Sequence, residues 1–385
     1  MRRPLRIVVA GSTARAPGQG GWAWALLQYV LGFRQLGHRV FWIDPLERDR
    51  PGLHGVRLAR SHNAAWFRML VSRFGLDDCS SLLVEREVET IGRARAVAIQ
   101  AARESDVLLN VSGVLKDDDI LGAAARRVYL DLDPGFTQLW QAVEGVDMRL
   151  DAHTDFVTIG MTLSRSGLPD LDRQWIATRQ PIVLEHWPPA GPAVERDAFT
   201  TVANWRGYGS ITADGTFFGQ KAHSFRQFLD LPTRTGDRFA VALGIHPDER
   251  TDIDALRTTG WELLDPASAA GTPDLFQRFV QGSLAEIAIA KRGYVVRPTG
   301  WFSDRSICYL ASGRPVVAQD TGLADVLPTG TGVLTFTTMD EAVESIRRVR
   351  RDYAEHARAA RAIAEECFDS GTVLARLLRN LELAA

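Results

Sequence analysis

The segment 294–322, YVVRPTGWFSDRSICYLASGRPVVAQDTG, constrains the fold of this chain more than any other part of it. Its polar turn GWFSDRS predicts the start of an amphipathic helix over 303–312, because serine and aspartate favour the first turn of a helix. Gly313-Arg314-Pro315 stops that helix. The apolar residues that follow predict a buried strand over 315–318, which ends in a polar QDTG turn.

The two polar turns of this helix–strand unit are suited to bind an anion. A helix N-terminus presents unpaired N–H groups and the positive end of the helix dipole, so it binds phosphate readily. In open α/β sheets, ligands lie outside the carboxyl ends of the strands, where the QDTG turn is expected. Two such turns suit a diphosphate attached to a ribose or a sugar, although plain helix capping uses the same residue types. The candidate ligand-binding residues are Ser303, Arg305, Ser306, Asp320, Thr321 and Gly322.

The rest of the chain alternates between short apolar runs and helical stretches. Residues 5–10 form a near-continuous apolar run, which is typical of a parallel strand buried on both faces. Strands are predicted at 5–10, 40–43, 107–111, 128–132, 156–159 and 182–184, and again at 201–203, 239–243, 261–264, 295–296 and 315–318. This alternation predicts an α/β fold with doubly wound, mostly parallel sheets.

The length of the chain indicates two domains. At 385 residues it is too long for one ordinary core. The proline-rich segment 186–197 is the best candidate for a linker. We therefore predict one Rossmann-like domain over 1–185 and a second over 198–365, followed by a C-terminal helix within 366–385.

Several motifs resemble those of bacterial glycosyltransferases of the GT-B fold, the glycosyltransferase group 1-like proteins. In many of these enzymes a helix that begins at the donor diphosphate ends in A-x-G-x-P-V-V, and ASGRPVV occupies 311–317 here. The segments FVTIG (156–160), TRQPIVL (178–184), GWFSDRS (300–306) and QDTG (319–322) also resemble segments of a group of bacterial glycosyltransferase-like proteins. The resemblance covers most of the chain in the same order.

The resemblance implies two Rossmann-like domains that face a cleft, with the C-terminal helix packed back on the first domain. The second domain would bind a nucleoside-diphosphate sugar. The substrates are not part of the resemblance, and our own expectation for the first domain is a small-molecule or saccharide acceptor, as in natural product biosynthesis. The chain would then be a hexosyltransferase that needs no metal and no other cofactor. Many retaining enzymes hold the donor with two glutamates, but Gly300 and Cys308 stand at the matching positions. Asp304 and Asp320 are the candidate replacements, which leaves both retention and inversion open.

The resemblance also assigns residues in the loop after the first strand of the second half. In many GT-B enzymes an arginine after this strand and a lysine further on hold the donor diphosphate, and Arg206 and Lys221 match that arrangement. Two cations can neutralise the charge that develops on a departing nucleoside diphosphate. Trp205 lies in the same loop and could stack on a base or a sugar. Solvated surface cations and a core tryptophan are the alternatives.

A glycine-rich loop, GQGG (18–21), opens a helix after the first predicted strand. Gly18, Gly20 and Gly21 would let a substrate approach the backbone, so we interpret the loop as part of an acceptor site or of the cleft. The spacing is not G-x-G-x-x-G, but Asp44 after the second strand means that a nicotinamide-dinucleotide site remains an alternative interpretation. A tight turn without a ligand is the alternative.

The first half is expected to supply any catalytic base. Asp133 follows a predicted strand and His153 precedes one, so either could take the proton of an acceptor hydroxyl in an inverting transfer. Both also have ordinary structural explanations, because Asp-Pro-Gly is a common turn and a histidine before a strand can act as a cap. In a retaining transfer a separate base would be dispensable.

Charge, cysteines and hydrophobicity limit the remaining possibilities. The net charge is −2, with both signs interspersed, so we expect no nucleic-acid partner. Cys79, Cys308 and Cys367 form no metal motif and suit free thiols, so we expect a cytoplasmic protein without a metal site. No run approaches the ~18 apolar residues that a membrane helix needs, so we expect no membrane segment.

Three other functions compete with sugar transfer. A sugar-nucleotide epimerase of the same fold would form product from the donor alone. A non-catalytic partner would bind the nucleotide sugar without transferring it, and the missing glutamate pair gives this alternative some weight. A dinucleotide-dependent oxidoreductase would require binding of a nicotinamide cofactor, and the imperfect glycine pattern disfavours it.

Overall fold

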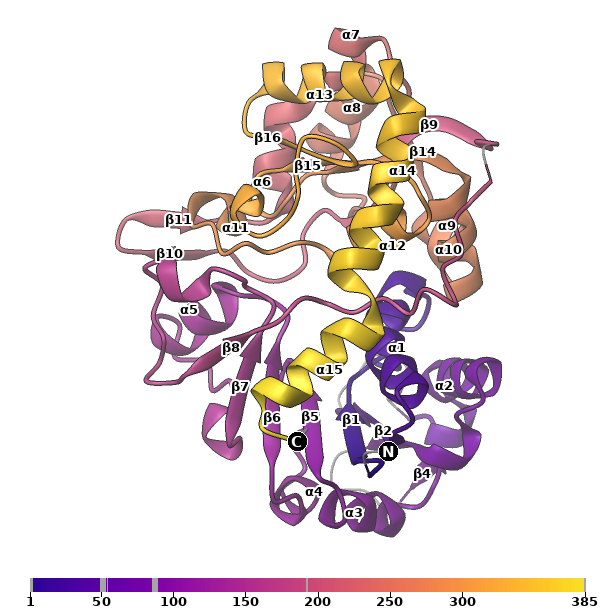
Figure 1. Cartoon of the computed structure of the whole chain (residues 1–385), viewed down its shortest axis with the longest axis vertical. Helices are drawn as coiled ribbons and strands as arrows, with labels where there is room; N and C mark the ends of the chain where they lie inside the picture. Colours follow the sequence, from indigo (N-terminus) through magenta and orange to yellow (C-terminus); the bar gives the residue numbers. More distant parts are fainter. Residues whose placement is uncertain (1–2, 49–52, 54, 85–88, 192, 384–385) are drawn as a thin grey trace.

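The computed structural model describes residues 3–48, 53, 55–84, 89–191 and 193–383. They form two halves, each built around a parallel sheet that is flanked by helices (Figure 1). The first sheet lies in the lower half of that view and the second in the upper half. The predicted α/β fold with two doubly wound units is therefore confirmed.

The first half contains an 8-stranded sheet in the order β4-β3-β2-β1-β5-β6-β7-β8. Neighbouring strands are parallel except β3 and β4, which are antiparallel. Val9 of β1 lies opposite Trp42 of β2 and Leu109 of β5, all of them buried, as expected for a sheet covered on both faces. The strands are β1 (Arg6–Ala10), β2 (Arg39–Leu46), β3 (Ser80–Val84), β4 (Thr90–Gly92), β5 (Val107–Val111), β6 (Arg127–Asp131), β7 (Asp155–Thr158) and β8 (Trp175–Ala177).

The helices of the first half include one that is buried along most of its length. Helix α1 is buried from Ala23 to Phe33, because it packs against the sheet and against helices α10 (Pro273–Gly282) and α15 (Ser370–Asn380). The α-helices that the structure describes in this half are α1 (Gly20–Gln35), α2 (His62–Phe74), α3 (Arg95–Arg103), α4 (Asp118–Ala123) and α5 (Phe136–Ala142). The N-terminus of α1 thereby reaches the other half.

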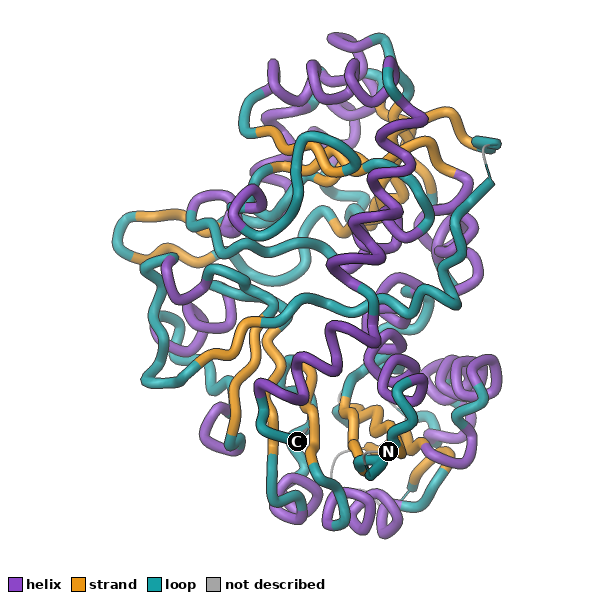
Figure 2. The backbone as a smooth tube through the Cα atoms, viewed as in Figure 1, coloured by secondary structure: helices purple, strands orange, loops and turns teal. Residues whose placement is uncertain are grey.

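The second half contains a 6-stranded parallel sheet in the order β13-β12-β9-β14-β15-β16. Its strands are β9 (Arg196–Asn204), β12 (Phe239–Gly244), β13 (Trp261–Leu264), β14 (Ser283–Ala288), β15 (Val316–Gln319) and β16 (Val333–Phe336). A separate hairpin, β10 (Ile211–Ala213) and β11 (Thr216–Phe218), projects toward α5 of the first half (Figure 2). The two halves therefore touch at the hairpin as well as at α1.

The remaining helices cover the second sheet, and the last of them returns to the first half. They are α6 (Lys221–Phe225), α7 (Leu231–Thr235), α8 (Arg250–Thr258), α9 (Pro266–Ala270), α10, α11 (Arg292–Val296), α12 (Asp304–Ala311), α13 (Met339–Arg351), α14 (Tyr353–Ile363) and α15. In Figure 1, α14 runs down from the upper half and α15 crosses the lower one. The Ser370 N–H of α15 donates to the Ile182 carbonyl at 2.9 Å. A side chain at Gly32 of α1 would collide with Leu374, so the two helices pack closely.

Most predicted strands are confirmed, and two are wrong. Residues 182–184 form only a single bridge, from Ile182 to Asp369, and 295–296 belong to helix α11. The sequence does not predict the central strand β14, because Glu286 stands in its middle and charged residues are rare inside buried strands. Between β8 and β9 the chain passes from one sheet to the other, and Pro192 of the predicted linker lies outside the described residues.

Candidate active site

A cleft of about 500 Å³ lies between the two halves. In each sheet the strand order reverses at the first strand, β1 or β9, and ligands of such sheets bind outside the carboxyl ends of the strands at this point. The residues predicted from the sequence that line this cleft are Gly18, Gly20, Gly21, Asp133, Lys221, Ser303, Asp304 and Arg305. Within the described part of the chain, its lining does not include His153, Trp205, Arg206, Ser306, Asp320, Thr321 or Gly322.

A second cleft of about 460 Å³ belongs mainly to the first half. It lies at the carboxyl ends of β1, β2 and β5, which is the switch point of the first sheet. Trp22, Asp133 and Tyr208 line both clefts, so the two spaces meet at these residues. We call the space between the halves the interdomain cleft and the other the first-half cleft.

Asp133 stands at this junction and is held by three residues of the second half. Its Oδ1 accepts hydrogen bonds from Lys291 Nζ at 2.9 Å, from Tyr294 OH at 2.6 Å and from Tyr208 OH. The Lys291 ammonium also lies 3.8 Å from the centre of the Tyr208 ring. Burial by itself would raise the pKa of Asp133, but the Lys291 charge and the tyrosine hydroxyls outweigh it and hold the pKa below its usual value. Asp133 is therefore an ionised carboxylate that joins the two halves.

Lys291, Tyr208 and Tyr294 were not predicted from the sequence. Lys291 follows β14 by three residues, at the carboxyl end of a central strand, where ligands of this fold class bind. The apolar run 287–290 just before it is the sequence feature that could have placed it.

The second half supplies three cations to the interdomain cleft: Lys221, Lys291 and Arg305. Lys221 is the first residue of α6, and its Nζ donates to the Ile289 carbonyl. Burial, and then the charges of Arg305 and Lys291, lower the pKa of Lys221 well below its usual value. An anion in the cleft would relieve this repulsion and stabilise the charged ammonium. The arrangement is therefore suited to a di-anionic group such as a diphosphate.

Arg305 already has a partner inside the protein. Its guanidinium pairs with Glu286 and donates to the Val202 carbonyl at 2.9 Å. The Glu286 side chain is 0% exposed and that of Arg305 13%, so this is a buried ion pair. Arg305 thus lines the cleft but also neutralises a carboxylate in the middle of β14, a role that the sequence did not reveal.

The N-terminus of α12 points into the same cleft. Ser303 stands at the N-cap, is 4% exposed and makes no capping hydrogen bond with its side chain. Asp304 also lines the cleft, and burial raises its pKa despite the neighbouring Arg305. Ser306, by contrast, is buried within α12. The predicted helix N-terminus is confirmed, with Ser303 rather than Ser306 facing the cleft.

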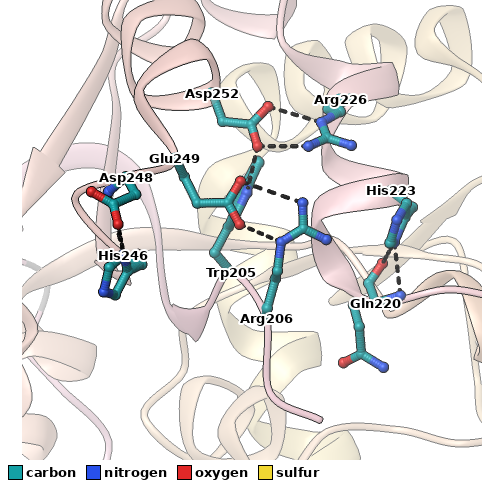
Figure 3. Close-up of polar contacts among 9 residues, drawn as sticks. All are labelled: Trp205, Arg206, Gln220, His223, Arg226, His246, Asp248, Glu249 and Asp252. Carbon is teal, nitrogen blue, oxygen red and sulfur yellow. Dashed lines mark hydrogen bonds and ion pairs between the residues drawn. The ribbon is translucent and has the colours of Figure 1, made fainter. Parts of the chain in front are cut away.

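Trp205 and Arg206 have partners away from the cleft (Figure 3). Trp205 is 1% exposed, and its indole Nε1 donates to Asp252 Oδ2 at 2.8 Å, so it is a core residue and cannot stack on a ligand. The Arg206 guanidinium pairs with Glu249. The next residue but one, Tyr208, is the residue of this loop that reaches Asp133.

The QDTG turn supports a neighbouring loop instead of lining the cleft. The Asp320 carboxylate accepts from the Gly322 and Leu323 N–H groups, each at 2.9 Å, which is ordinary capping. Thr321 is buried, and its hydroxyl donates to the Trp301 carbonyl at 2.6 Å. The QDTG turn therefore holds the loop that precedes α12. Of the two interpretations of this turn, ligand binding or plain capping, the structure favours capping.

Glycines are needed in the loop that lines the cleft because this loop packs closely against the second half. A Cβ atom at Gly20 would lie 2.1 Å from the Thr272 carbonyl oxygen, and one at Gly21 would lie 2.9 Å from the Phe276 ring. Both glycines thus allow the N-terminus of α1 to contact the second half. Asp44 is fully buried and accepts from the Thr13 N–H at 2.9 Å, so its carboxylate is not presented to a ribose. This geometry disfavours a nicotinamide-dinucleotide site.

His153 is buried beside the sheet with both ring nitrogens bonded. Nδ1 lies 2.8 Å from the Arg149 carbonyl, which can only accept, so Nδ1 carries the proton. Nε2 then accepts from Asn110 Nδ2 at 3.0 Å. Such a histidine has no free nitrogen for a substrate. Of the two predicted bases, Asp133 alone faces the clefts in the described structure.

We expect His153 to make stability depend on pH. Burial lowers its pKa to about 4, whereas the unfolded chain titrates near 6.5. Between these values the unfolded state binds a proton that the folded state does not, so stability falls as the pH falls. When the pH is lowered from 7 to 5, the free energy of unfolding of the wild type should fall by about 2 kcal/mol more than that of the variant His153→Gln, as measured by urea unfolding. A 100-fold loss of turnover in His153→Gln at pH 7 would instead identify it as a base.

Among the described residues, no group of three His, Cys, Asp or Glu side chains is arranged to hold a metal ion. None of the helices in the described ranges is both long and apolar enough to cross a membrane.

Comparison with known proteins identifies the fold. An alpha-glucosyltransferase in complex with UDP-glucose and DNA containing an abasic site matches with a TM-score of 0.61 at 11% identity, over 99% of this chain and 100% of that chain. HepE of Anabaena in complex with UDP-glucose matches with a TM-score of 0.61 at 12% identity, over 98% of this chain and 99% of that chain. A glycosyltransferase from Rickettsia africae matches with 0.57 at 11% identity, over 99% and 98%. The fold is GT-B. No family model and no curated protein sequence matches the chain.

The comparison confirms the resemblance to GT-B proteins at the level of the fold.

Our expectation that the chain has no nucleic-acid partner is wrong, because three matched alpha-glucosyltransferase structures contain DNA, with an abasic site, an HMU base or an A:G mismatch. The exclusion rested on the net charge of the whole chain. Contacts with nucleic acid depend on where cations lie on the surface, so a near-neutral chain of this fold is not barred from such a partner.

Proposed function

We propose that this chain transfers a hexosyl group from a nucleoside-diphosphate sugar to an acceptor hydroxyl. The observation that carries the proposal is the interdomain cleft, where Lys221, Lys291 and Arg305 meet beside the N-terminus of α12 at the switch point of the second sheet. The GT-B fold supports it, since matched structures over the whole chain contain UDP or UDP-glucose.

In this proposal the second half binds the donor. The diphosphate lies between Lys221 and Lys291, with the first turn of α12 completing the anion site. Both cations act most strongly when the leaving diphosphate gains charge, so they accelerate the reaction by stabilising the transition state. Neither role requires a metal ion.

The acceptor lies in the first-half cleft and meets the donor at Asp133. This carboxylate lines both clefts and is ionised, so it can take the proton of an acceptor hydroxyl. Its bonds to Tyr208 and Tyr294 fix its position. Asp133 is therefore the proposed general base of an inverting transfer.

We further propose that the reaction takes place in the cytoplasm, belongs to natural product biosynthesis and needs neither a metal nor another cofactor. The three cysteines, which form no metal motif and suit free thiols, support the cytoplasm. An epimerase of the same fold is the main competitor. Incubation with the nucleotide sugar alone separates the two, because an epimerase converts the sugar without any acceptor.

Calorimetry with UDP, dTDP, GDP and ADP is the direct test of the donor site. We expect at least one of them to bind, and Lys291→Met to weaken that binding by roughly 10- to 100-fold, the usual loss for a hydrogen bond to a charged group. Lys116→Met is the matched control, because Lys116 pairs with Glu47 in the first-half cleft. The proposal fails if no diphosphate binds the wild type.

A further inference from the structure

Asp131 is a buried carboxylate that is bonded to neutral donors. It is the last residue of β6 and is 0% exposed. Its Oδ1 accepts from the Thr137 hydroxyl at 2.7 Å and from the Asp133 N–H at 2.9 Å. Its Oδ2 accepts from the Thr158 hydroxyl at 2.9 Å and from Gln138 Nε2 at 3.2 Å. Donors from the turn after β6, from α5 and from β7 therefore meet at one side chain.

The stability of the fold does not explain a charge at this position. Burial raises the pKa of Asp131 to about 6 from an ordinary value of 3.8, and the hydrogen bonds only partly offset the rise. The folded state thus holds this proton more tightly than the unfolded state, so stability falls as the pH rises between these two values. An ionised Asp131 lowers stability at neutral pH, which points to a role other than supporting the fold.

The contacts around Asp131 fix the turn that carries Asp133. The Gly135 N–H donates to Gln138 Oε1 at 2.6 Å, and the Thr137 N–H donates to the Asp133 carbonyl at 3.0 Å. Gly135 has a φ of 93°, in the left-handed region that favours glycine, so the chain turns sharply into α5. The turn is therefore bonded both to the end of β6 and to the first turn of α5.

The FVTIG segment (156–160) holds the same turn from the neighbouring strand β7. The Thr158 hydroxyl donates to Asp131 and accepts from the Gly160 N–H at 3.1 Å. A Cβ atom at Gly160 would lie 2.6 Å from the Cβ atom of Pro134, so a glycine is needed for the turn to pack against the end of β7. This segment therefore supports the turn before α5.

We propose that Asp131 is a positioning residue for Asp133. Asp131 holds the backbone of the turn within the first half. Lys291, Tyr208 and Tyr294 hold the Asp133 carboxylate from the second half. A displacement of about 1 Å at a reacting group can lower a rate by about 10²-fold, so a base at the meeting point of two clefts needs such a support. The catalytic part of this role rests on the proposed function, whereas the positioning itself does not.

An NMR titration of the full chain, labelled with carbon-13 at the aspartate carboxyl groups, tests the positioning without any reaction. The variant Asp133→Asn assigns the signal. Asp131→Asn leaves one acceptor oxygen where the carboxylate has two, so we expect Asp133 to move away from Lys291. Its pKa should then rise above the wild-type value, because burial alone raises it. Loss of a neighbouring negative charge would lower the pKa instead, so an unchanged or lower pKa would overturn the proposal.

Asp44→Asn is the matched control for this titration. Asp44 is also fully buried near the end of a strand, burial raises its pKa to about 7, and it accepts from the N–H and the hydroxyl of Thr13. It lies outside the lining of both clefts in the described structure, so the pKa of Asp133 should stay low in this variant.

Thr158 provides a second pair of variants in case Asp131→Asn does not fold. Thr158→Val keeps both carboxylates and removes one hydrogen bond to Asp131, so it should raise the pKa of Asp133 by less than Asp131→Asn. Thr158→Ser keeps the hydroxyl and should preserve the wild-type pKa. A wild-type pKa of Asp133 in Thr158→Val would count against the positioning role.

Release of UDP from UDP-glucose connects the positioning with catalysis. Asp131→Asn should lower turnover by about 10- to 100-fold and change KM by less than about 2-fold. In the Asp133→Asn background the same replacement should lower turnover by less than about 2-fold, because no base is left to position. Equal losses in both backgrounds would overturn the role in catalysis. Full turnover of Asp133→Asn alone, or no release by the wild type, would refute the proposed function and leave the NMR result to decide the positioning.

Discussion

Replacing Arg305 with alanine is expected to lower the free energy of unfolding by about 3–5 kcal/mol, the usual cost of removing one partner of a buried ion pair. The Glu286 carboxylate lies in the centre of β14 with 0% exposure, and the Arg305 guanidinium is its counter-ion. Without the arginine, a buried charge is left unpaired inside the second sheet. Urea unfolding followed by circular dichroism measures the loss.

The matched control for Arg305→Ala removes both charges. The double variant Glu286→Met with Arg305→Met should recover most of the lost stability, because apolar residues of similar volume can replace buried ion pairs at little cost. Nucleotide binding by the double variant then reports the phosphate contact of Arg305 separately from its structural role. If Arg305→Ala is as stable as the wild type, the ion pair does not support β14 in solution.

Replacing Asp133 with asparagine is expected to lower turnover by ~10²–10⁴-fold, the usual contribution of a general base, while nucleotide binding stays unchanged. Asparagine keeps the shape of the side chain but cannot take a proton. Because the pKa of Asp133 is held below its usual value, the base stays ionised throughout the neutral range. Steady-state transfer kinetics and calorimetry on the same variant provide the two measurements.

Tyr294→Phe is the matched control for Asp133→Asn. It removes the 2.6 Å hydrogen bond to Asp133 but leaves the carboxylate in place, so turnover should fall by less than about 10-fold. NMR of the product gives its anomeric configuration. A retained configuration together with full turnover of Asp133→Asn would contradict the proposed base.

Much of the fold could be predicted because it follows from local patterns in the sequence. The apolar run of β1 and the capping residues before α12 specify their own conformation through neighbours in the sequence. The alternation of such runs with helices then leads to two doubly wound sheets. Strand β14 escaped prediction because its pattern includes Glu286, which is tolerated only through Arg305, 19 residues further along.

The candidate site could be predicted only in part, because position along a strand does not determine what a side chain contacts. Ser303 and Arg305 were expected from the start of a predicted helix and Lys221 from the family resemblance, and all three line the interdomain cleft. Trp205 stands in the expected loop but turns into the core to bond Asp252. Asp320 stands at the expected strand end but caps its own turn.

The sequence by itself determined the alternation of strands and helices that gives the α/β class and the position of the N-terminus of α12, since both depend on residues that are close in the chain. Only the tertiary structure decided which groups share a site. Asp133 meets Tyr208, Lys291 and Tyr294, which are 75 to 161 positions away. The same contacts set its charge state, because the pKa of a buried carboxylate depends on neighbours that only the packing of the two halves provides.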